Sequence, residues 1–248
     1  MDNKLIPAFD SKLIPAAVLA IGIASAGFFA GHGLVKSRLG FRTVTVKGLA
    51  ERSVKADLGF WPIKFVATGP SLADARASLN SSNVAVQNYL KAQGFAPADI
   101  SVQNIQVQDK WADSYGQQVS EGVRYVLTEN VMVRSTDVNK ISTASSGIAA
   151  LIDQGVIFSS DSYSAGPTFL FTKLNDLKPV LLTEATRRAR DAAQQFAQQS
   201  GARVGGIQNA NQGVIEVNPA VEIPNESGEK QIDKTVRVVT TITYFIKG

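Results

Sequence analysis

Residues 43–65 read TVTVKGLAERSVKADLGFWPIKF, a stretch in which polar and apolar side chains alternate. Alternation with a period of two is typical of a β-strand that buries one face. The stretch therefore predicts a strand at residues 42–48, a turn at Glu51 and Arg52, and a second, longer strand at residues 53–68.

The longer strand changes phase in its middle. Its apolar residues lie first on one face and then on the other, in the order Val54, Ala56, Leu58 and Phe60, followed by Trp61, Ile63, Phe65 and Ala67. Gly59 and Pro62 flank the point of change, and both residue types are common at bulges and on edge strands. We therefore predict a β-bulge near Trp61.

Two long helices are predicted. Ser71 followed by Asp74 approximates a capping box, and apolar residues at helical spacing continue from there to Gly94. The second helix begins near Asp176 and ends at Gly201. Its predicted apolar face consists of Leu182, Ala185, Ala189, Ala192 and Phe196. A face of this kind should pack flat on a sheet.

Further strands complete the pattern. A second phase change, at Asn104, predicts another bulge, and Asp137 can cap a short helix. The other predicted strands are residues 99–110, 123–133, 156–163, 168–173, 203–217 and 235–246. This order predicts an α+β fold with a largely antiparallel sheet and helices between paired strands, preceded by one N-terminal transmembrane helix.

The segment at residues 13–35 reads LIPAAVLAIGIASAGFFAGHGLV and contains no formally charged residue. As a helix it would be about 35 Å long, which is enough to cross a bilayer. We predict a tail at residues 1–12, a transmembrane anchor at residues 13–35 and one domain at residues 36–248. The alternative is a signal peptide cleaved after Ala26, because Ala24-Ser25-Ala26 fits such a site.

Small residues line one face of the predicted anchor. They recur at helical spacing and include a G-x-x-x-G motif, in the order Ala16, Ala20, Ala24, Gly27 and Gly31. Faces of this kind let helices approach closely in lipid. They predict that the anchor contributes to self-association.

Three stretches resemble the SIMPL-domain family of bacterial envelope proteins. They are the opening stretch at residues 43–65, GFAPADISVQNIQV at residues 94–107, and EATRRARDAAQQFAQQSGARVGGI at residues 184–207. The resemblance implies an exported α+β domain, ring-like homo-oligomers in some members, and a loose link to envelope and oxidative stress. It supplies no established catalytic residues.

Composition excludes several kinds of chemistry. The only histidine, His32, lies near the end of the apolar segment at residues 13–35, and the chain has no cysteine. We therefore predict neither a Ser-His-Asp nor a Cys-His arrangement, and no metal or cofactor. Its net charge of +4 is scattered, which argues against nucleic-acid binding. Trp61 and Trp111 are predicted to pack at a sheet edge or subunit contact, and Asp57 to lie in an outward-facing or turn position.

Together these features predict a non-enzymatic envelope protein that assembles into a homo-oligomeric ring. We expect a single-pass protein of the bacterial inner membrane, with the C-terminal domain in the periplasm and with lipid and another envelope protein as partners. The alternative is a periplasmic protein that binds a small molecule or peptide, which should contain an apolar pocket with a few convergent polar groups. A hydrolase should instead show paired carboxylates with displaced pKa values.

Overall fold

The computed structural model describes residues 13–39, 42–113, 123–159 and 166–247, without the side chains of residues 13–17 and 34–39. Its helices and strands are α1 (Leu13–Leu39), β1 (Thr43–Lys55), β2 (Leu58–Gly69), α2 (Leu72–Ala92), η1 (Pro97–Asp99), β3 (Ile100–Asp109), α3 (Lys110–Asp113), β4 (Tyr125–Ser135), α4 (Val138–Ser146), η2 (Ile148–Leu151), β5 (Ile157–Phe158), β6 (Thr168–Leu170), α5 (Leu174–Gln199), β7 (Arg203–Pro219), η3 (Gly228–Lys230) and β8 (Asp233–Lys247).

The chain divides into two compact units. Unit 1 consists of Met1–Leu49, Glu184–Gly213 and Val239–Gly248, and unit 2 of Ala50–Thr183 and Val214–Val238. Four elements, β1, α5, β7 and β8, contribute residues to both units. Each unit is therefore built from segments that lie far apart in the sequence, and the α+β fold with antiparallel sheets is confirmed.

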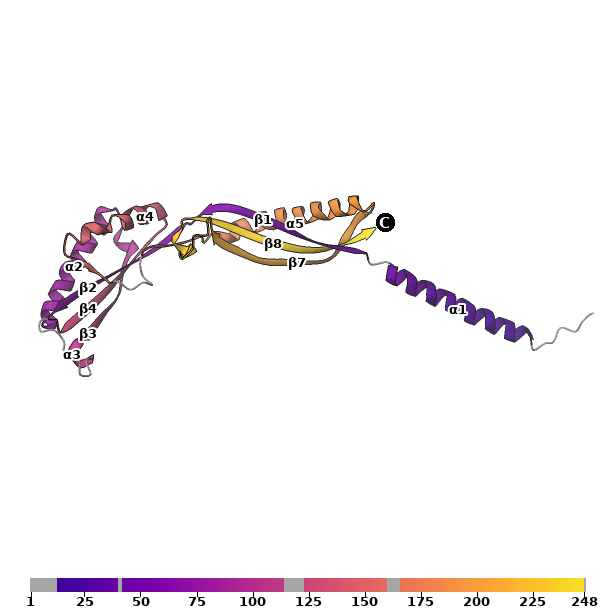
Figure 1. Cartoon of the computed structure of the whole chain (residues 1–248), viewed down its shortest axis with the longest axis horizontal. Coiled ribbons are helices and arrows are strands. Elements are labelled where there is room, and N and C mark those ends of the chain that lie inside the picture. Colours follow the sequence, from indigo (N-terminus) through magenta and orange to yellow (C-terminus); the bar gives the residue numbers. More distant parts are fainter. Residues whose placement is uncertain (1–12, 40–41, 114–122, 160–165, 248) are drawn as a thin grey trace, which may run out of the picture. The chain divides into compact units, whose positions relative to one another are not determined.

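Unit 2 contains a sheet in the order β3-β4-β2-β5, with β6 also paired to β2, and these pairs are antiparallel. The helices α2 and α4 pack against this sheet, as Figure 1 shows. Ser71 caps α2 by accepting a hydrogen bond from the Asp74 amide, as predicted. The buried core includes Trp61, Ile63, Phe65, Leu79, Val86, Leu90, Val131 and Val133.

The first phase change has a different cause from the one predicted. The strand β2 pairs with β4 from Gly59 to Gly69 without a register shift, so the predicted bulge near Trp61 is wrong. Instead, the chain leaves β1 at Lys55 and enters β2, in the other sheet, at Leu58. The predicted turn at Glu51 and Arg52 is also wrong, because β1 continues through both residues. The bulge predicted near Asn104 is confirmed by a register shift in β3.

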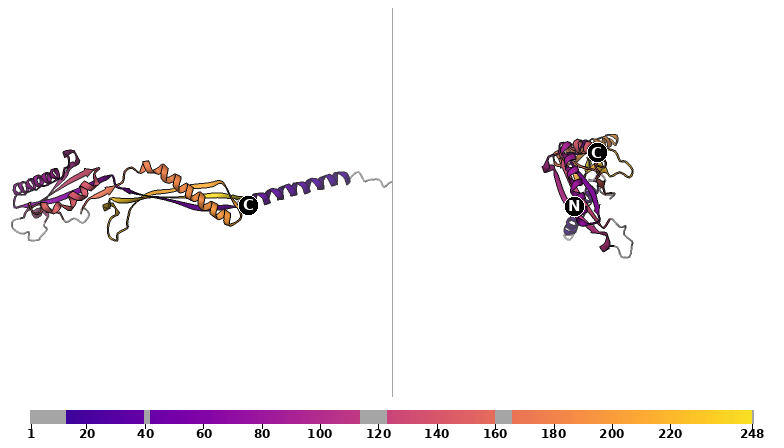
Figure 2. Two further views of the ribbon diagram at one scale, coloured as in Figure 1. Left: turned by 90° about the horizontal axis from the view of Figure 1, so that it is seen from above. Right: turned by 90° about the vertical axis from the view of Figure 1, so that its left-hand side faces the viewer.

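In unit 1, α5 packs on the sheet that has the order β1-β8-β7, and Figure 2 shows the helix running along these strands. The packing is close because α5 presents alanines: Ala185, Ala189 and Ala193 are fully buried. A Cβ atom added to Gly48 would lie 1.9 Å from the Ala185 carbonyl oxygen. The buried residues of α5 recur every four positions, at Leu181, Ala185, Ala189, Ala193 and Ala197. Phe196, predicted on the buried face, lies outside this row and is 63% exposed, so that prediction is wrong.

The helix α1 extends over Leu13–Leu39. Its described side chains, residues 18–33, are all exposed, and they include large apolar ones such as Phe28 and Phe29. Judged on the residues that are described, none of the helices combines the length and the apolar character needed to cross a bilayer.

Candidate functional site: an exposed edge strand and an aromatic cluster

The strand β3 lies at one edge of the sheet in unit 2 and pairs with β4. Val102, Ile105 and Val107 remain 48%, 53% and 57% exposed. We call these three residues the β3 stripe. Directly opposite residues of paired strands point to the same side of a sheet. The stripe therefore shares a side with the β4 residues that face the core.

The helix α2 covers the core side of β2 and β4 but leaves the stripe half-exposed. Val102 is opposite Val131, and Val107 is opposite Leu127. Both β4 residues are buried, whereas the side chains opposite them on β3 are not. The apolar pattern of β3 is thus that of a strand with one buried face, although no described element covers that face. An apolar strip of this kind marks an interaction site more often than an isolated surface aliphatic does.

The backbone of β3 adds to this character. An edge strand presents unpaired N–H and C=O groups, and soluble proteins usually protect such edges with lysine, proline or a bulge. The sequence of β3, ISVQNIQVQD, contains neither lysine nor proline. A bulge between Val102 and Asn104 is the protective feature present. From Asn104 to Asp109 the register is regular, so this part of the edge can accept another strand.

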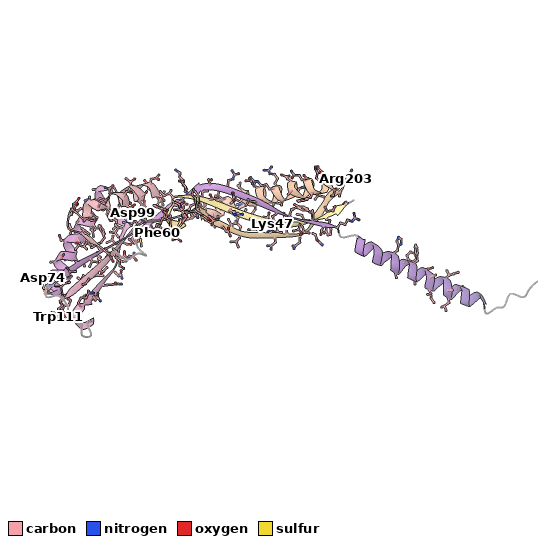
Figure 3. The ribbon with its side chains drawn as sticks, in the orientation of Figure 1. Lys47, Phe60, Asp74, Asp99, Trp111 and Arg203 are labelled. Atoms are coloured by element: carbon pink, nitrogen blue, oxygen red, sulfur yellow. The ribbon has the colours of Figure 1, made fainter. Side chains whose placement is uncertain are left out.

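An aromatic and ionic cluster lies where β3 ends and α3 begins, near the labelled Trp111 in Figure 3. The Arg124 guanidinium donates hydrogen bonds to both carboxylate oxygens of Asp109, at 2.9–3.2 Å. Its Cζ atom also lies 4.7 Å from the centre of the Trp111 ring and 4.9 Å from the centre of the Tyr125 ring. Cation–π contact and ion pairing together hold Arg124 in one position.

The ion pair between Arg124 and Asp109 determines the electrostatics of this cluster. The hydrogen bond from Arg124 holds the pKa of Asp109 below its usual range, so that carboxyl group stays ionised. Trp111 remains 58% exposed although Arg124 covers part of its ring. Tryptophan, tyrosine and arginine are the residues that most often dominate the energy of protein interfaces. Their conjunction at the end of an exposed strand indicates a contact surface.

A buried carboxylate lies on the same side of the sheet as the stripe. Glu129 of β4 is opposite Ile105 and only 2% exposed. The Asn83 amide donates a hydrogen bond to Glu129, and Gln87 donates one to the Asn83 carbonyl oxygen at 2.6 Å. Burial raises the pKa of Glu129, and the Asn83 hydrogen bond opposes that rise. Among the described residues, the hydrogen-bond partner of this carboxylate is the Asn83 amide, which supplies neither a nucleophile nor a second acid.

The residues predicted from sequence lie in different surroundings. Trp61 is 2% exposed and belongs to the core of unit 2, so the prediction that it contacts a partner is wrong. Trp111 is exposed, and its interface role stays a prediction. Asp57 occupies a turn, as expected, where its carboxylate accepts hydrogen bonds from the backbone amide and the hydroxyl of Thr172.

The small-residue face of α1 also stays a prediction. Its described members, Ala20, Ala24, Gly27 and Gly31, are exposed, and a Cβ atom added at either glycine meets nothing within 4 Å. The side chain of Ala16 lies outside the described residues. The face is thus open to a partner, and no described residue occupies it.

Sequence reasoning missed the exposure of the β3 stripe and the burial of Glu129. The Glu129 position carried a signal, because it interrupts the apolar row of Leu127, Val131 and Val133 on β4. For metals, the described ranges contain no group of three or more His, Cys, Asp or Glu side chains that could hold an ion.

Comparison with known proteins places the chain in a family. A sequence model of the SIMPL family, described as a protein of unknown function (DUF541), matches residues 44–242. The chain belongs to the SIMPL family. The match includes β2, β3, β4 and α5, and hence both the β3 stripe and the Trp111 cluster.

Other comparisons add little. No curated protein matches this SIMPL chain. Among solved structures it is similar to an amidase of the hydantoinase/carbamoylase family from Burkholderia phymatum, with 17% identity and a TM-score of 0.25. That similarity covers 53% of this chain and 32% of the amidase, so the chain spans about a third of that protein's length. A TM-score this low carries no argument about fold or activity.

Proposed function

We propose that this SIMPL protein is a non-enzymatic, membrane-anchored component of the bacterial envelope that assembles with copies of itself through β3. The observation that carries the proposal is the β3 stripe, three half-exposed aliphatic side chains on a strand whose outer edge pairs with no described strand. Joining such an edge to another chain satisfies its backbone groups and buries the aliphatic side chains together.

The assembly we propose is a ring. A ring requires a head-to-tail interface, in which β3 of one copy meets a different surface of the next copy and the rotation closes. The Trp111 cluster supports an interface at this end of β3, because Arg124 is already held against two aromatic rings and loses little side-chain entropy when a partner binds. Through its resemblance to the family, we connect the assembly with the response to envelope or oxidative stress, with another envelope protein as a partner.

The anchor is the second part of the proposal. We propose that residues 13–35 stay attached and span the inner membrane once, with residues from about 36 onward in the periplasm. Support comes from α1, where large apolar side chains such as Val18, Ile21 and Phe29 are each at least 65% exposed. A helix that is apolar all round is buried in a protein core or spans a membrane. The span we propose, residues 13–35, is longer than the stretch 18–33 whose side chains the structure describes. Intact-mass measurement on protein from its native membrane tests retention, since a chain starting at Gly27 would contradict it.

Size measurement in nanodiscs tests the interface. Ile105→Lys places a charge in the middle of the stripe and should lower the mass of the assembly. Ile152→Lys is the matched control, because Ile152 is 59% exposed and follows η2, away from β3. Thermal unfolding confirms that both variants fold. An Ile105→Lys protein that keeps the wild-type mass would remove β3 from the interface.

Photo-crosslinking gives an independent test. A photoreactive amino acid at position 107, in cells, should crosslink two copies of the chain, and the same group at position 152 should not. Mass spectrometry of the product identifies the surface that β3 meets. Crosslinks only to other proteins would contradict self-association through β3.

The non-enzymatic part is tested by a broad screen for hydrolytic activity. We expect no turnover. If turnover were found and Glu129→Gln abolished it, the buried carboxylate would be catalytic and the proposal would be wrong.

A further inference from the structure

A lysine is buried at the start of β8. Lys234 is 4% exposed and occupies the first place in the row of buried β8 residues that continues with Val236 and Val238. Moving an ammonium group from water into a protein interior is costly unless the group is well paired. A lysine at a position where an apolar side chain would pack therefore suggests a chemical role.

The ammonium group of Lys234 is only partly satisfied. It donates a hydrogen bond to the Gly228 carbonyl oxygen at 2.6 Å. An ammonium carries three N–H donors, and this is the one hydrogen bond that the described residues provide. Burial lowers the pKa of Lys234, while the negative charge of Glu229 acts in the opposite direction. Two donors are thus left for another group.

Lys234 lines a cavity of about 370 Å³ within unit 2. The walls come from the end of β6 and the following loop, the end of β7, and η3. They are largely apolar and include Phe169, Leu170, Phe171, Val217 and Pro219. A volume of this size lies within the range of small-molecule sites, which combine apolar walls with a few convergent polar groups.

The walls of the cavity are held in place by contacts outside it. The backbone N–H of Asp57 donates a hydrogen bond to the Leu170 carbonyl oxygen at 3.0 Å. The Asp57 carboxylate accepts a hydrogen bond from the backbone N–H of Thr172 at 2.7 Å. On the opposite side, a Cβ atom added to Gly228 would lie 2.9 Å from the Pro219 ring. The loop after β6 is thus tied to Asp57, and Gly228 of η3 packs closely on Pro219 of β7. Contacts that order the walls of a site before a ligand binds lower the entropic cost of binding.

We propose that this cavity binds a small organic acid, a monocarboxylate with an apolar body. The carboxylate accepts hydrogen bonds from the Lys234 ammonium, and the apolar body contacts Phe171 and Val217. Glu229 also lines the cavity and is exposed at its surface. Its charge repels a second negative charge on the ligand, so a monoanion is preferred to a dianion. This binding activity goes beyond the proposed assembly, because none of the cavity residues belongs to β3.

Calorimetry on the full chain in nanodiscs tests the proposal with phenylacetate as the probe. Phenylacetamide has the same shape without the charge, and phenylmalonate carries a second carboxylate. We expect phenylacetate to bind about tenfold or more tightly than either comparator, as hydrogen bonds to a charged group imply. Equal affinity for phenylacetate and phenylacetamide, or no binding of phenylacetate at millimolar concentration, would overturn the proposal.

Two variants locate the site. Lys234→Met should weaken phenylacetate binding about tenfold or more. Lys230→Met removes the same charge from an exposed position on η3 and should leave binding unchanged. Val217→Trp fills the cavity but keeps Lys234, and it should also abolish phenylacetate binding. This variant tests the location of the site if Lys234→Met fails to fold. Wild-type affinity in Val217→Trp would show that the acid binds elsewhere. Ile105→Lys, which tests the assembly, should bind phenylacetate normally.

Discussion

Gly48→Ala should destabilise unit 1 by forcing β1 and α5 apart. The added Cβ atom would lie 1.9 Å from the Ala185 carbonyl oxygen and 2.7 Å from the Ala189 amide nitrogen. Ordinary contacts of this kind begin near 3.4 Å. The helix would therefore retreat by about 1.5 Å, since both colliding groups are backbone and no side chain can rotate away.

The expected loss is about 2–3 kcal/mol of unfolding free energy. Overpacking costs about 1–3 kcal/mol, and a backbone collision belongs at the upper end of that range. Replacing glycine in a strand offsets this by less than about 1 kcal/mol. Ala189 and Ala193, now fully buried, would also lose contact with the sheet. Urea denaturation followed by circular dichroism measures the difference, and hydrogen exchange of the α5 amides shows where it arises.

Gly206→Ala is the matched control. Gly206 lies on β7 in the same unit, and a Cβ atom added there meets nothing within 4 Å. The control should be as stable as the wild type or slightly more stable. A Gly48→Ala protein as stable as Gly206→Ala would refute the close packing of α5 on β1.

Three further substitutions test the polar groups of unit 2. Burial raises the pKa of Glu129, so its ionisation costs the wild type stability as pH rises through that pKa. In urea titrations, the unfolding free energy of Glu129→Gln should equal that of the wild type near pH 3.5. At pH 8 it should be larger, by about 1.4 kcal/mol for each unit by which folding raises the pKa of Glu129. Asp109→Asn should increase acrylamide quenching of Trp111 fluorescence, because Arg124 would no longer be held over the ring. Unchanged quenching would contradict that contact. Asp57→Ala should lose about 1–3 kcal/mol in thermal unfolding, because Thr172 loses two hydrogen bonds.

Local patterns in the sequence were sufficient for features that depend on near neighbours. The capping of α2 by Ser71 needs only a side chain three residues from its partner. The bulge near Asn104 follows from a change of apolar phase within one strand. In each case the interactions that decide the local structure lie mostly within a few residues of one another, so their spacing can be read directly.

The tertiary structure decided which faces are covered. A change of apolar phase marks a bulge at Asn104. A similar change near residues 55–58 marks the place where the chain passes from one sheet to the other. Local pattern cannot tell these two cases apart, because β1 pairs with β8 from the far end of the sequence. Alternation predicted that Ile105 and Val107 share a face, but not that α2 leaves both side chains half-exposed. Lys234 continues a buried apolar row, and its burial depends on η3 and the loop after β6. Periodicity records which side chains share a face, whereas burial depends on contacts between segments that are distant along the chain.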